Sequence, residues 1–409
     1  MDCAVSIPQK NALVKEGLGV NPAMEGVVCS MRKSKEKVSN LDSLSALLLT
    51  FIALSGEFPT EQISRLPSTD AYKEKVIKSL KNNGLIRTYY RDGLRGLRLT
   101  AAAKKQLAAD WPDRFFPLFT GDTMTNAPKY TIAHRLRLHR MAEVLVSMFN
   151  VGISSFPWEK PAVFTPTPLY KPPYIEWSAY YSSREVKGLG AAATKIRNSR
   201  AVGLLLTDGC IFSIYNTGSA LMKWEYQAEM RLKAMLQIEL CQKRLSRQFG
   251  DAELSAILFG NHMGQVPALL DADTKCRNHF IQDGSYHHFY FLTNDHYGDI
   301  ILYLLLHPDE KDALDNILAQ GLDPARPNWP VVNDAMDGDS PVLFGYTCDM
   351  PRIKKFGHAL HIQDRTGTLY CFDFQEEAMR LVCGSNVEIQ HIDFDAYEGS
   401  VFHQPQETD

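Results

Sequence analysis

The stretch Asn40–Leu107 reads NLDSLSALLLTFIALSGEFPTEQISRLPSTDAYKEKVIKSLKNNGLIRTYYRDGLRGLRLTAAAKKQL. Asn40 can cap a strongly apolar helix, and the segments TEQISRL and STDAYKEKVIKSLKNNG each begin with a capping residue typical of a helix start. Beyond Gly84 the apolar period falls from about 3.6 to about 2 on both sides of Asp92-Gly93, a dipeptide that favours a tight hairpin. This order predicts a winged helix-turn-helix with the hairpin as its wing.

Basic side chains follow the last helix and the hairpin of this stretch. Val76, Ile77 and Leu80 supply an inward apolar stripe, which leaves the lysines for the other faces. Lys, Arg and Asn can reach the phosphates and base edges of a DNA groove. The expected contacts to double-stranded DNA are Lys73, Lys75, Lys78, Lys81, Asn82, Arg87, Tyr90, Arg91, Arg95 and Arg98. An exposed basic face without a ligand, or a protein-docking winged helix, is the alternative.

Charge is distributed unevenly along the 409 residues. Residues 1–150 hold 22 basic and 14 acidic side chains, whereas the remainder holds 22 basic and 33 acidic ones. An acidic surface repels a phosphate backbone, so nucleic-acid contact is expected at the N-terminal end. Eight cysteines without metal-finger spacing are typical of free thiols, and no apolar run is long enough to span a bilayer. These features favour a cytoplasmic protein that binds no membrane.

Composition and turn signals divide the chain into five parts. They are a flexible arm (1–39), the winged helix-turn-helix (40–110), a linker with a basic helix (111–172), an α/β domain (173–265) and a C-terminal α/β region (266–409). The basic helix carries Arg135, Arg137, His139 and Arg140 in its first half, and we expect a basic face near the DNA module. The fold class is therefore α+β or α/β, with several domains.

The α/β domain has the element order of a PD-(D/E)xK nuclease core. A helix precedes three strands, of which the last two form a hairpin around Asp208-Gly209, and a helix and the buried strand LSAILFG follow. The expected E-x-K motif is missing from the third strand. The catalytic candidates for this alternative are Glu176 and Glu185, which could hold Mg²⁺, and Lys187, which could polarise the attacking water. Ser182 followed by Glu185 is equally typical of a helix N-terminus.

The C-terminal region alternates between apolar runs and amphipathic segments. The runs SYHHFYFL, DIILYLLLH, PVLFGYTC, TLYCFDF and VEIQHIDF are expected as strands, and DEKDALDNILAQGL and QEEAMRLV as helices. His358 and His361 are expected in a strand-like run, where a buried or edge histidine is commoner than a metal ligand. No repeat of 20 to 50 residues is found.

The segments YYSSREVKG, SRAVGLLL and YNTGSALMKWEYQAEMR, placed after a winged helix and a Pro-rich stretch, carry a resemblance to a known group. Over roughly residues 40–260 the chain resembles uncharacterised winged-helix proteins of integrative conjugative elements and plasmids, similar to the replication-relaxation family. The resemblance implies a DNA-binding protein of a mobile element.

The leading hypothesis is a double-stranded DNA-binding accessory protein of replication, relaxation or conjugative transfer, with replication or transfer proteins as further partners. It needs no cofactor and is more consistent with a non-enzyme. One alternative is a metal-dependent nuclease or nickase, the only case that calls for Mg²⁺. A second alternative is a transcriptional regulator with a ligand-sensing or dimerising C-terminal domain. The sequence does not set the oligomeric state.

Overall fold

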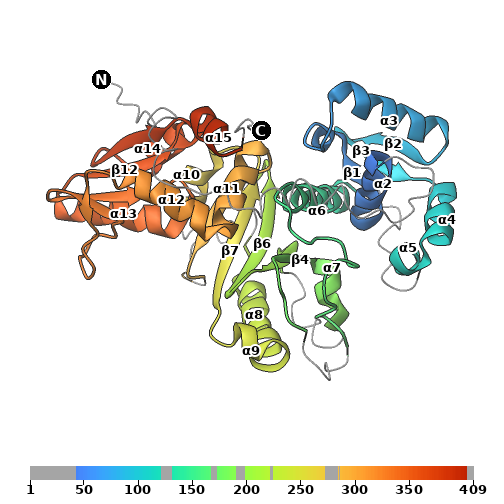
Figure 1. Ribbon diagram of the computed structural model, residues 1–409, viewed down its shortest axis with the longest axis horizontal. Helices are drawn as coiled ribbons and strands as arrows, with labels where there is room; N and C mark the ends of the chain where they lie inside the picture. The colour runs from blue at the N-terminus through green and yellow to red at the C-terminus, as the bar shows by residue number, and fades with distance from the viewer. Residues whose placement is uncertain are drawn as a thin grey trace, which may run out of the picture.

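A computed structural model describes residues 43–120, 131–166, 173–189, 199–221, 224–271, 284 and 286–402. The expected arm 1–39 lies outside the described residues. Three units follow one another along the chain, and Figure 1 shows them side by side: an N-terminal unit (43–120), a first sheet unit (131–306) and a second sheet unit (308–402). The molecule is a mixed α+β protein with several sheets.

The N-terminal unit combines helices with a small antiparallel sheet of order β1-β3-β2. Its elements are α2 (Ser43–Ser55), β1 (Phe58–Pro59), η2 (Thr60–Ile63), α3 (Asp70–Asn82), β2 (Ile86–Arg91), β3 (Leu94–Leu99), α4 (Ala101–Asp110) and α5 (Pro112–Phe119). The hairpin turns at Asp92 and Gly93, both with positive φ, as the dipeptide predicts. Val76 and Leu80 are buried on the inner face of α3. The expected helix after Thr60 is only a short 3₁₀ turn.

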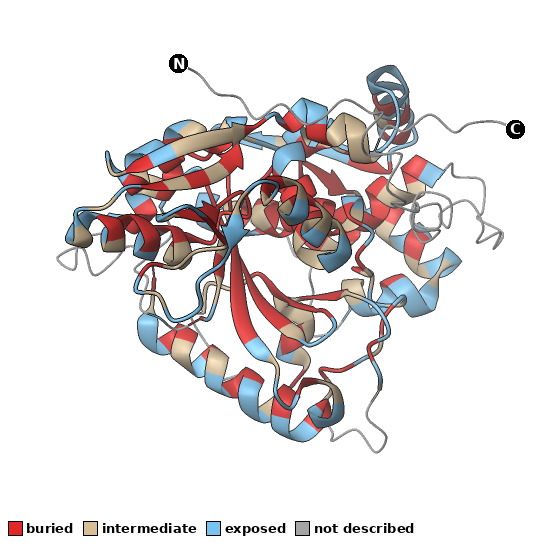
Figure 2. Ribbon diagram, turned by 60° about the vertical axis from the view of Figure 1, so that its left-hand side comes forward, coloured by how far each residue is buried: buried red, intermediate tan, exposed pale blue. Residues whose placement is uncertain are grey.

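The first sheet unit is built around the five-stranded sheet β4-β5-β6-β7-β8. Its elements are α6 (Ile132–Asn150), β4 (Ala179–Ser182), α7 (Ser183–Val186), β5 (Gly203–Leu206), β6 (Cys210–Gly218), α8 (Tyr226–Leu236), η4 (Gln237–Arg244), α9 (Ser246–Phe249), β7 (Glu253–Gly260), α10 (Gln265–Leu270), β8 (Phe289–Thr293) and α11 (His296–Leu306). The hairpin β5–β6 and the strand β7 are confirmed. The two long strands, β6 and β7, are buried over almost their whole length (Figure 2).

The second sheet unit holds the sheet β9-β10-β11-β12-β13. Its elements are α12 (Pro308–Leu318), β9 (Asp323–Pro324), β10 (Ala335–Asp337), β11 (Ser340–Phe344), α13 (Met350–Gln363), β12 (Gly367–Phe372), η5 (Asp373–Gln375), α14 (Glu376–Cys383), β13 (Val387–Ile392) and α15 (Phe394–Phe402). Helices α12 and α14 and strands β11, β12 and β13 agree with the sequence pattern.

Besides the short turn after Thr60, two further expectations about secondary structure are wrong. The run DIILYLLLH belongs to helix α11, not to a strand, because the Asp295 side chain accepts a hydrogen bond from Gly298 N and starts a helix that is then buried nearly all round. An apolar run without periodicity does not distinguish a buried strand from a buried helix. His358 and His361 lie on helix α13 and not in a strand-like run.

The two large sheets repeat one topology. In each, the first two strand pairs are antiparallel and the last two are parallel. A helix precedes each sheet (α6 or α12), helices lie in both parallel crossovers, and a helix follows the last strand (α11 or α15). The second sheet unit is therefore a more compact version of the first.

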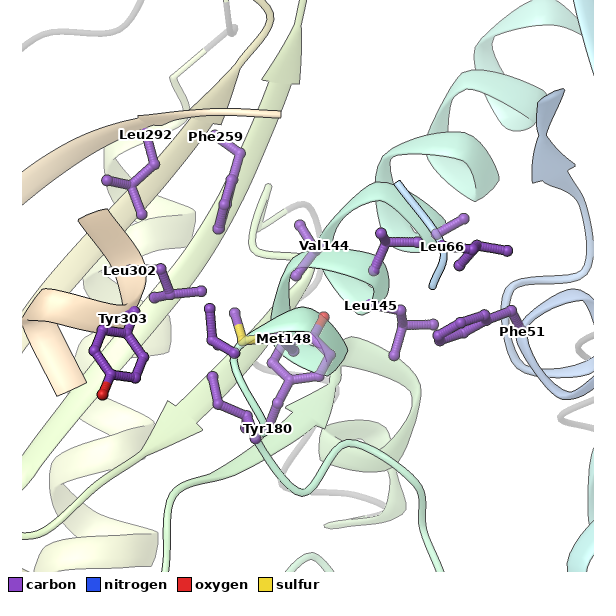
Figure 3. Close-up of a cluster of buried hydrophobic side chains, with 14 of the residues drawn as sticks. Phe51, Leu66, Val144, Leu145, Met148, Tyr180, Phe259, Leu292, Leu302 and Tyr303 are labelled. Atoms are coloured by element: carbon purple, nitrogen blue, oxygen red, sulfur yellow. The ribbon is translucent and has the colours of Figure 1, made fainter. Parts of the chain in front are cut away.

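Helix α6 lies in the centre of the molecule, inside the segment 111–172 that the sequence presents as a linker. Ten of its residues are buried. Leu145 faces Phe51 of α2, whereas Val144 and Met148 face the first sheet, so one hydrophobic core is continuous from the N-terminal unit to β7 and β8 (Figure 3). Burial of these apolar surfaces stabilises the contact between the N-terminal unit and the first sheet unit, so α6 is part of the core and does not act as a linker.

Candidate nucleic-acid interface

The outer face of α3 carries exposed cations. Lys75, Lys78, Lys81 and Asn82 are all exposed, and α3 stands at the edge of the molecule in Figure 1. Within the residues that the structure describes, none of the three lysines forms an ion pair or a hydrogen bond through its ammonium group. Their positive charge is therefore not neutralised by a neighbouring carboxylate.

Lys73 differs from the other lysines of α3. Its ammonium group donates to Ser64 O at 2.7 Å and to Asp70 Oδ1 at 3.0 Å, and the residue is 5% exposed. Lys73 therefore holds the segment before α3 in place. The expectation that Lys73 contacts DNA is therefore wrong, because a buried ammonium group with two hydrogen-bond partners does not reach a phosphate.

The hairpin β2–β3 adds a second group of exposed side chains. Arg87, Tyr90, Arg91 and Arg95 are exposed, and the Arg95 guanidinium lies 5.7 Å from the centre of the Tyr90 ring. The pKa of Lys104 on α4 is lowered by burial and by the nearby positive charge of Arg87. Two cations that repel each other in this way mark a positive local field.

Arg98 is the second expected DNA contact that the structure contradicts. It is 6% exposed, and its Nε and NH2 atoms donate to Glu57 Oε2 at 2.9 and 2.7 Å. Its guanidinium packs over the Tyr89 ring at 3.8 Å. An arginine that is committed to a buried carboxylate is not available to DNA, so eight of the ten expected contact residues remain on the surface.

Glu57 is the centre of a buried charge cluster beneath the hairpin. Its side chain is fully buried, and its carboxylate forms ion pairs with Arg98, with Arg135 and with His139. Arg135 NH2 lies 2.6 Å and His139 Nε2 lies 2.9 Å from Glu57 Oε1. Burial by itself raises the pKa of Glu57, but hydrogen bonds from His139, Arg135 and Arg98 outweigh it and lower the pKa to about 2. The cluster thus holds one ionised carboxylate between two guanidinium groups.

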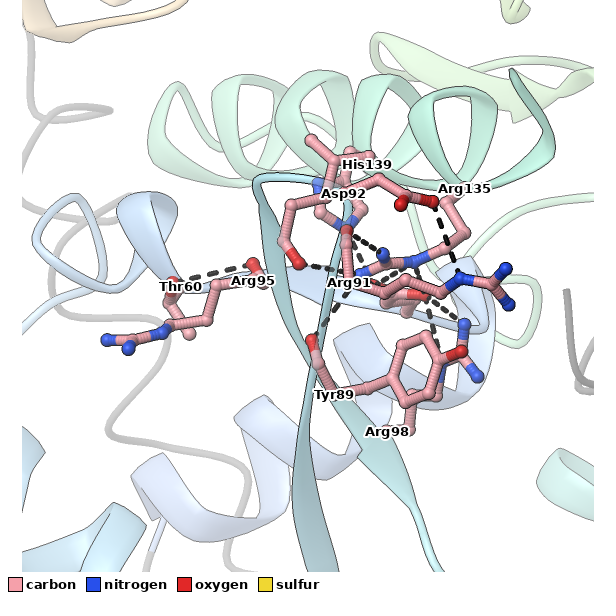
Figure 4. Close-up of polar contacts among 10 residues, drawn as sticks. Thr60, Tyr89, Arg91, Asp92, Arg95, Arg98, Arg135 and His139 are labelled. Atoms are coloured by element: carbon pink, nitrogen blue, oxygen red, sulfur yellow. Dashed lines mark hydrogen bonds and ion pairs between the residues drawn. The ribbon is translucent and has the colours of Figure 1, made fainter. Parts of the chain in front are cut away.

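Arg135 connects this cluster to the backbone of the hairpin. It donates to the carbonyl oxygens of Arg91 at 2.8 Å, Leu94 at 3.0 Å and Tyr89 at 3.3 Å, as drawn in Figure 4. Arg135 and His139 were expected to form part of a basic face, yet both are buried. The first half of α6 therefore clamps the hairpin tip, while Arg137 remains exposed.

The three nuclease candidates do not assemble into a metal site. Glu176 is exposed, and the Glu185 carboxylate completes a capping box with Ser182 and pairs with Lys160 at 3.0 Å. The pKa of Lys187 is lowered by burial and by the positive charges of Arg137 and Arg184, not raised by an acidic partner. Among the described residues, no three His, Cys, Asp or Glu side chains gather closely enough to hold a metal ion. These residues therefore do not fit a Mg²⁺-dependent nuclease centre.

Comparison with protein-family models, with curated proteins and with solved structures finds no match for this chain. No helix in the described ranges has the length and apolar character needed to cross a bilayer.

Proposed function

We propose that the protein binds double-stranded DNA through its N-terminal unit, with α3 in the major groove and the hairpin β2–β3 along the phosphate backbone. The observation that carries the proposal is the set of exposed cations on α3 and the hairpin: Lys75, Lys78 and Lys81 have no acidic partner among the described residues, and on the hairpin Arg91 pairs only with the exposed Asp92, at 3.4 Å. Neutralisation of phosphates with release of counterions is the main source of affinity in such complexes.

The proposal includes a winged-helix fold for residues 43–110. The order α2, β1, η2, α3, β2, β3 supports it, as does the pairing of the short strand β1 with β3. In this arrangement α3 takes the place of the recognition helix. An α-helix with side chains is about 10–12 Å wide, which matches a major groove about 12 Å wide.

The fixed hairpin also supports the proposal. Arg135 holds three hairpin carbonyl groups, so the backbone that carries Arg91 and Arg95 is already ordered before DNA arrives. Binding to a preorganised surface avoids the entropic cost of ordering a flexible loop. Phosphate contacts from such a hairpin position the recognition helix without reading sequence themselves.

The alternatives have less support. A nuclease centre lacks converging carboxylates in the described residues, and Glu185 serves as a capping residue. A role in replication, relaxation or transfer of a mobile element, with replication or transfer proteins as partners, stays a prediction that rests on the resemblance. A ligand-sensing regulator remains compatible with the same DNA-binding surface.

The test is a fluorescence-anisotropy titration of the full-length protein at two salt concentrations. The probes are a random-sequence duplex, the duplex upstream of the protein's own gene and a single strand of equal length, each with Mg²⁺ present. We expect salt-dependent binding to duplex DNA, which a gel afterwards finds intact. Absence of duplex binding at low salt would overturn the proposal, and nicked DNA would favour the nuclease alternative.

A further inference from the structure

A cavity of about 270 Å³ lies where the two sheet units meet. Strand β8 of the first unit and α12, the end of β11 and the first turn of α13 of the second unit form its wall. The two units are joined beside it by a hydrogen bond from Phe291 N to Cys348 O at 3.0 Å and by the isolated bridge between Tyr290 and Asp349. The DNA-binding surface proposed above lies in a different unit.

Three carboxylates in the wall each orient one cation. Asp349 accepts a hydrogen bond from His288 Nδ1 at 2.7 Å, and Asp334 accepts one from Arg352 NH2 at 2.5 Å. Asp315 pairs in the same way with Lys311. Asp349 raises the pKa of His288 through this hydrogen bond, which favours the cationic form of the ring.

The second oxygen of each carboxylate is held by another group. Asp349 Oδ1 accepts from Phe289 N at 3.3 Å, and Asp334 Oδ2 accepts from Phe344 N at 2.8 Å. Asp315 Oδ1 accepts from the Tyr346 hydroxyl at 2.6 Å. Because both oxygens of every carboxylate are engaged, these acids are poorly placed to bind a cation.

The cations, in contrast, keep donors to spare. Within the described residues His288, Lys311 and Arg352 each have one side-chain partner, although an ammonium group offers three donors and a guanidinium five. Asp349, the N-cap residue of α13, makes no side-chain capping bond to that helix, and Arg352 and Ile353 of its first turn line the cavity. The cavity therefore presents spare positive donors from three elements.

The repeated topology allows the position of the cavity to be compared between the two sheet units. In the second sheet unit the cavity lies between α12, which precedes the sheet, the segment just before the second strand β10, and the end of the third strand β11. In the first sheet unit the corresponding helix and strand carry Glu143 and Asn216, which bond to each other at 2.8 Å. In the second unit the Tyr346 hydroxyl, just after β11, bonds to Asp315 of α12 at 2.6 Å, and the cavity lies beside this contact.

We propose that this cavity binds a phosphate monoester with a small organic group. Each cation is paired with a carboxylate, so the wall carries little net charge, but unlike the buried Lys73 and Arg98 these side chains are partly exposed and keep unused donors. Donors from three directions suit a phosphate group, whose oxygens point in several directions. The volume exceeds that of an inorganic phosphate and lies just below the range of about 300–1,000 Å³ that is usual for ligand pockets. The Tyr290 ring, stacked on His288 at 5.7 Å, provides a flat wall for the organic part.

The test is isothermal titration calorimetry of the full-length protein with inorganic phosphate, a nucleoside 5′-monophosphate and the matching nucleoside. A short single strand, with and without a 5′-phosphate, distinguishes a free small molecule from the end of a DNA chain. We expect the monophosphate to bind one to one, inorganic phosphate to bind more weakly and the nucleoside not to bind. Failure of every phosphate-bearing probe to bind at millimolar concentration would overturn the proposal.

Variants locate the site. Arg352→Gln should weaken monophosphate binding about tenfold or more, because one charge-assisted hydrogen bond is lost. Lys355→Gln, an exposed neighbour on the same helix, should leave it unchanged. His288→Asn provides a second variant at a partly exposed side chain that is easily replaced without unfolding. Unchanged affinity in both Arg352→Gln and His288→Asn would contradict the assignment. Lys75→Ala with Lys78→Ala should not alter phosphate binding, which keeps this result separate from DNA binding.

Discussion

Glu57 shows how a single side chain couples distant parts of this protein. The carboxylate is fully buried, with Arg98 from the hairpin on one side and Arg135 and His139 from α6 on the other. Gly96 packs directly against it, since a Cβ atom there would lie 2.4 Å from Glu57 Oε1. Taking charges out of water is costly, so such a cluster persists only while every member keeps its partners.

Replacement of Glu57 by Gln should destabilise the protein by about 3–5 kcal/mol, because two guanidinium groups would stay buried without a counter-charge. Urea unfolding followed by circular dichroism measures the effect. Glu61→Gln, an exposed neighbour on η2, is the matched control and should change stability by about 0.5 kcal/mol or less. Equal stability of the two variants would contradict the role given to the cluster.

The same residue predicts a dependence on pH. The folded pKa of Glu57 is about 2, below its ordinary value of 4.5. A depressed pKa means that ionised Glu57 stabilises the fold fully above about pH 4.5, and that this contribution is lost as the pH falls through about 2. The stability difference between wild type and Glu57→Gln should therefore be largest near neutral pH and shrink as the pH falls from 4.5 towards 2.

Gly96→Ala tests the close packing of the hairpin against Glu57. The added methyl group would overlap the carboxylate, and overpacking of this kind costs about 1–3 kcal/mol. Gly399→Ala in α15 is the control, because its Cβ atom would meet nothing within 4 Å. We expect a lower melting temperature for Gly96→Ala alone, measured by calorimetry. An unchanged melting temperature would mean that the hairpin shifts freely.

At the level of secondary structure, α6 and α3 have opposite roles. Helix α6 is buried along most of its length and carries Arg135 and His139 into the core. Helix α3 buries only one side and leaves Lys75, Lys78 and Lys81 to solvent. Both helices are rich in basic residues, but their roles differ with burial. The buried Arg135 of α6 stabilises the fold, whereas the exposed lysines of α3 can contact a phosphate.

Lys75→Ala with Lys78→Ala should weaken duplex binding and reduce the salt slope by about two, since each phosphate contact contributes about one. Anisotropy titrations at several salt concentrations measure the slope. Arg247→Ala with Lys355→Ala removes the same charge from exposed positions outside the N-terminal unit and is the matched control. If both double variants bind DNA as wild type does, α3 is not the recognition helix.

At the level of the whole molecule, buried polar contacts join the N-terminal unit to the first sheet unit. Arg65 donates to Asp299 on α11 at 2.5 Å and to Ser147 on α6 at 2.7 Å, and Asn150 donates to Asp299 at 2.8 Å. Arg184 on α7 donates to Leu54 O at the end of α2. Because these contacts and a shared hydrophobic core join the two units, we expect them to unfold as one cooperative body.

Asp299→Asn should therefore loosen the N-terminal unit as well as α11. The change leaves Arg65 buried beside a neutral group, at a cost of about 3–5 kcal/mol. Hydrogen exchange should become faster in α2 and α3, although the altered residue lies in another unit. Asp309→Asn, exposed at the start of α12, is the control. Faster exchange confined to α11 would show that the units unfold independently.

The sequence by itself determined the features that depend on residues a few positions apart. The turn at Asp92-Gly93, the hairpin β5–β6 and the capping box of Ser182 and Glu185 all agree with the local pattern. Caps and tight turns are fixed by the hydrogen bonds and φ angles of neighbouring residues, so they are visible in one dimension. The exposed cations of α3 follow in the same way from helical periodicity.

Only the tertiary structure decided which charged residues are buried and what they contact. Arg135 and Glu57 are 78 positions apart, and Arg65 and Asp299 are 234 positions apart, so no local pattern pairs them. The repeated sheet topology is equally hidden, because the connection between the third and fourth strands spans 218–253 in one unit and 344–367 in the other. The free-energy cost of burying a charged side chain depends on which partners surround it. These partners come from distant parts of the sequence, and only the folded chain brings them together.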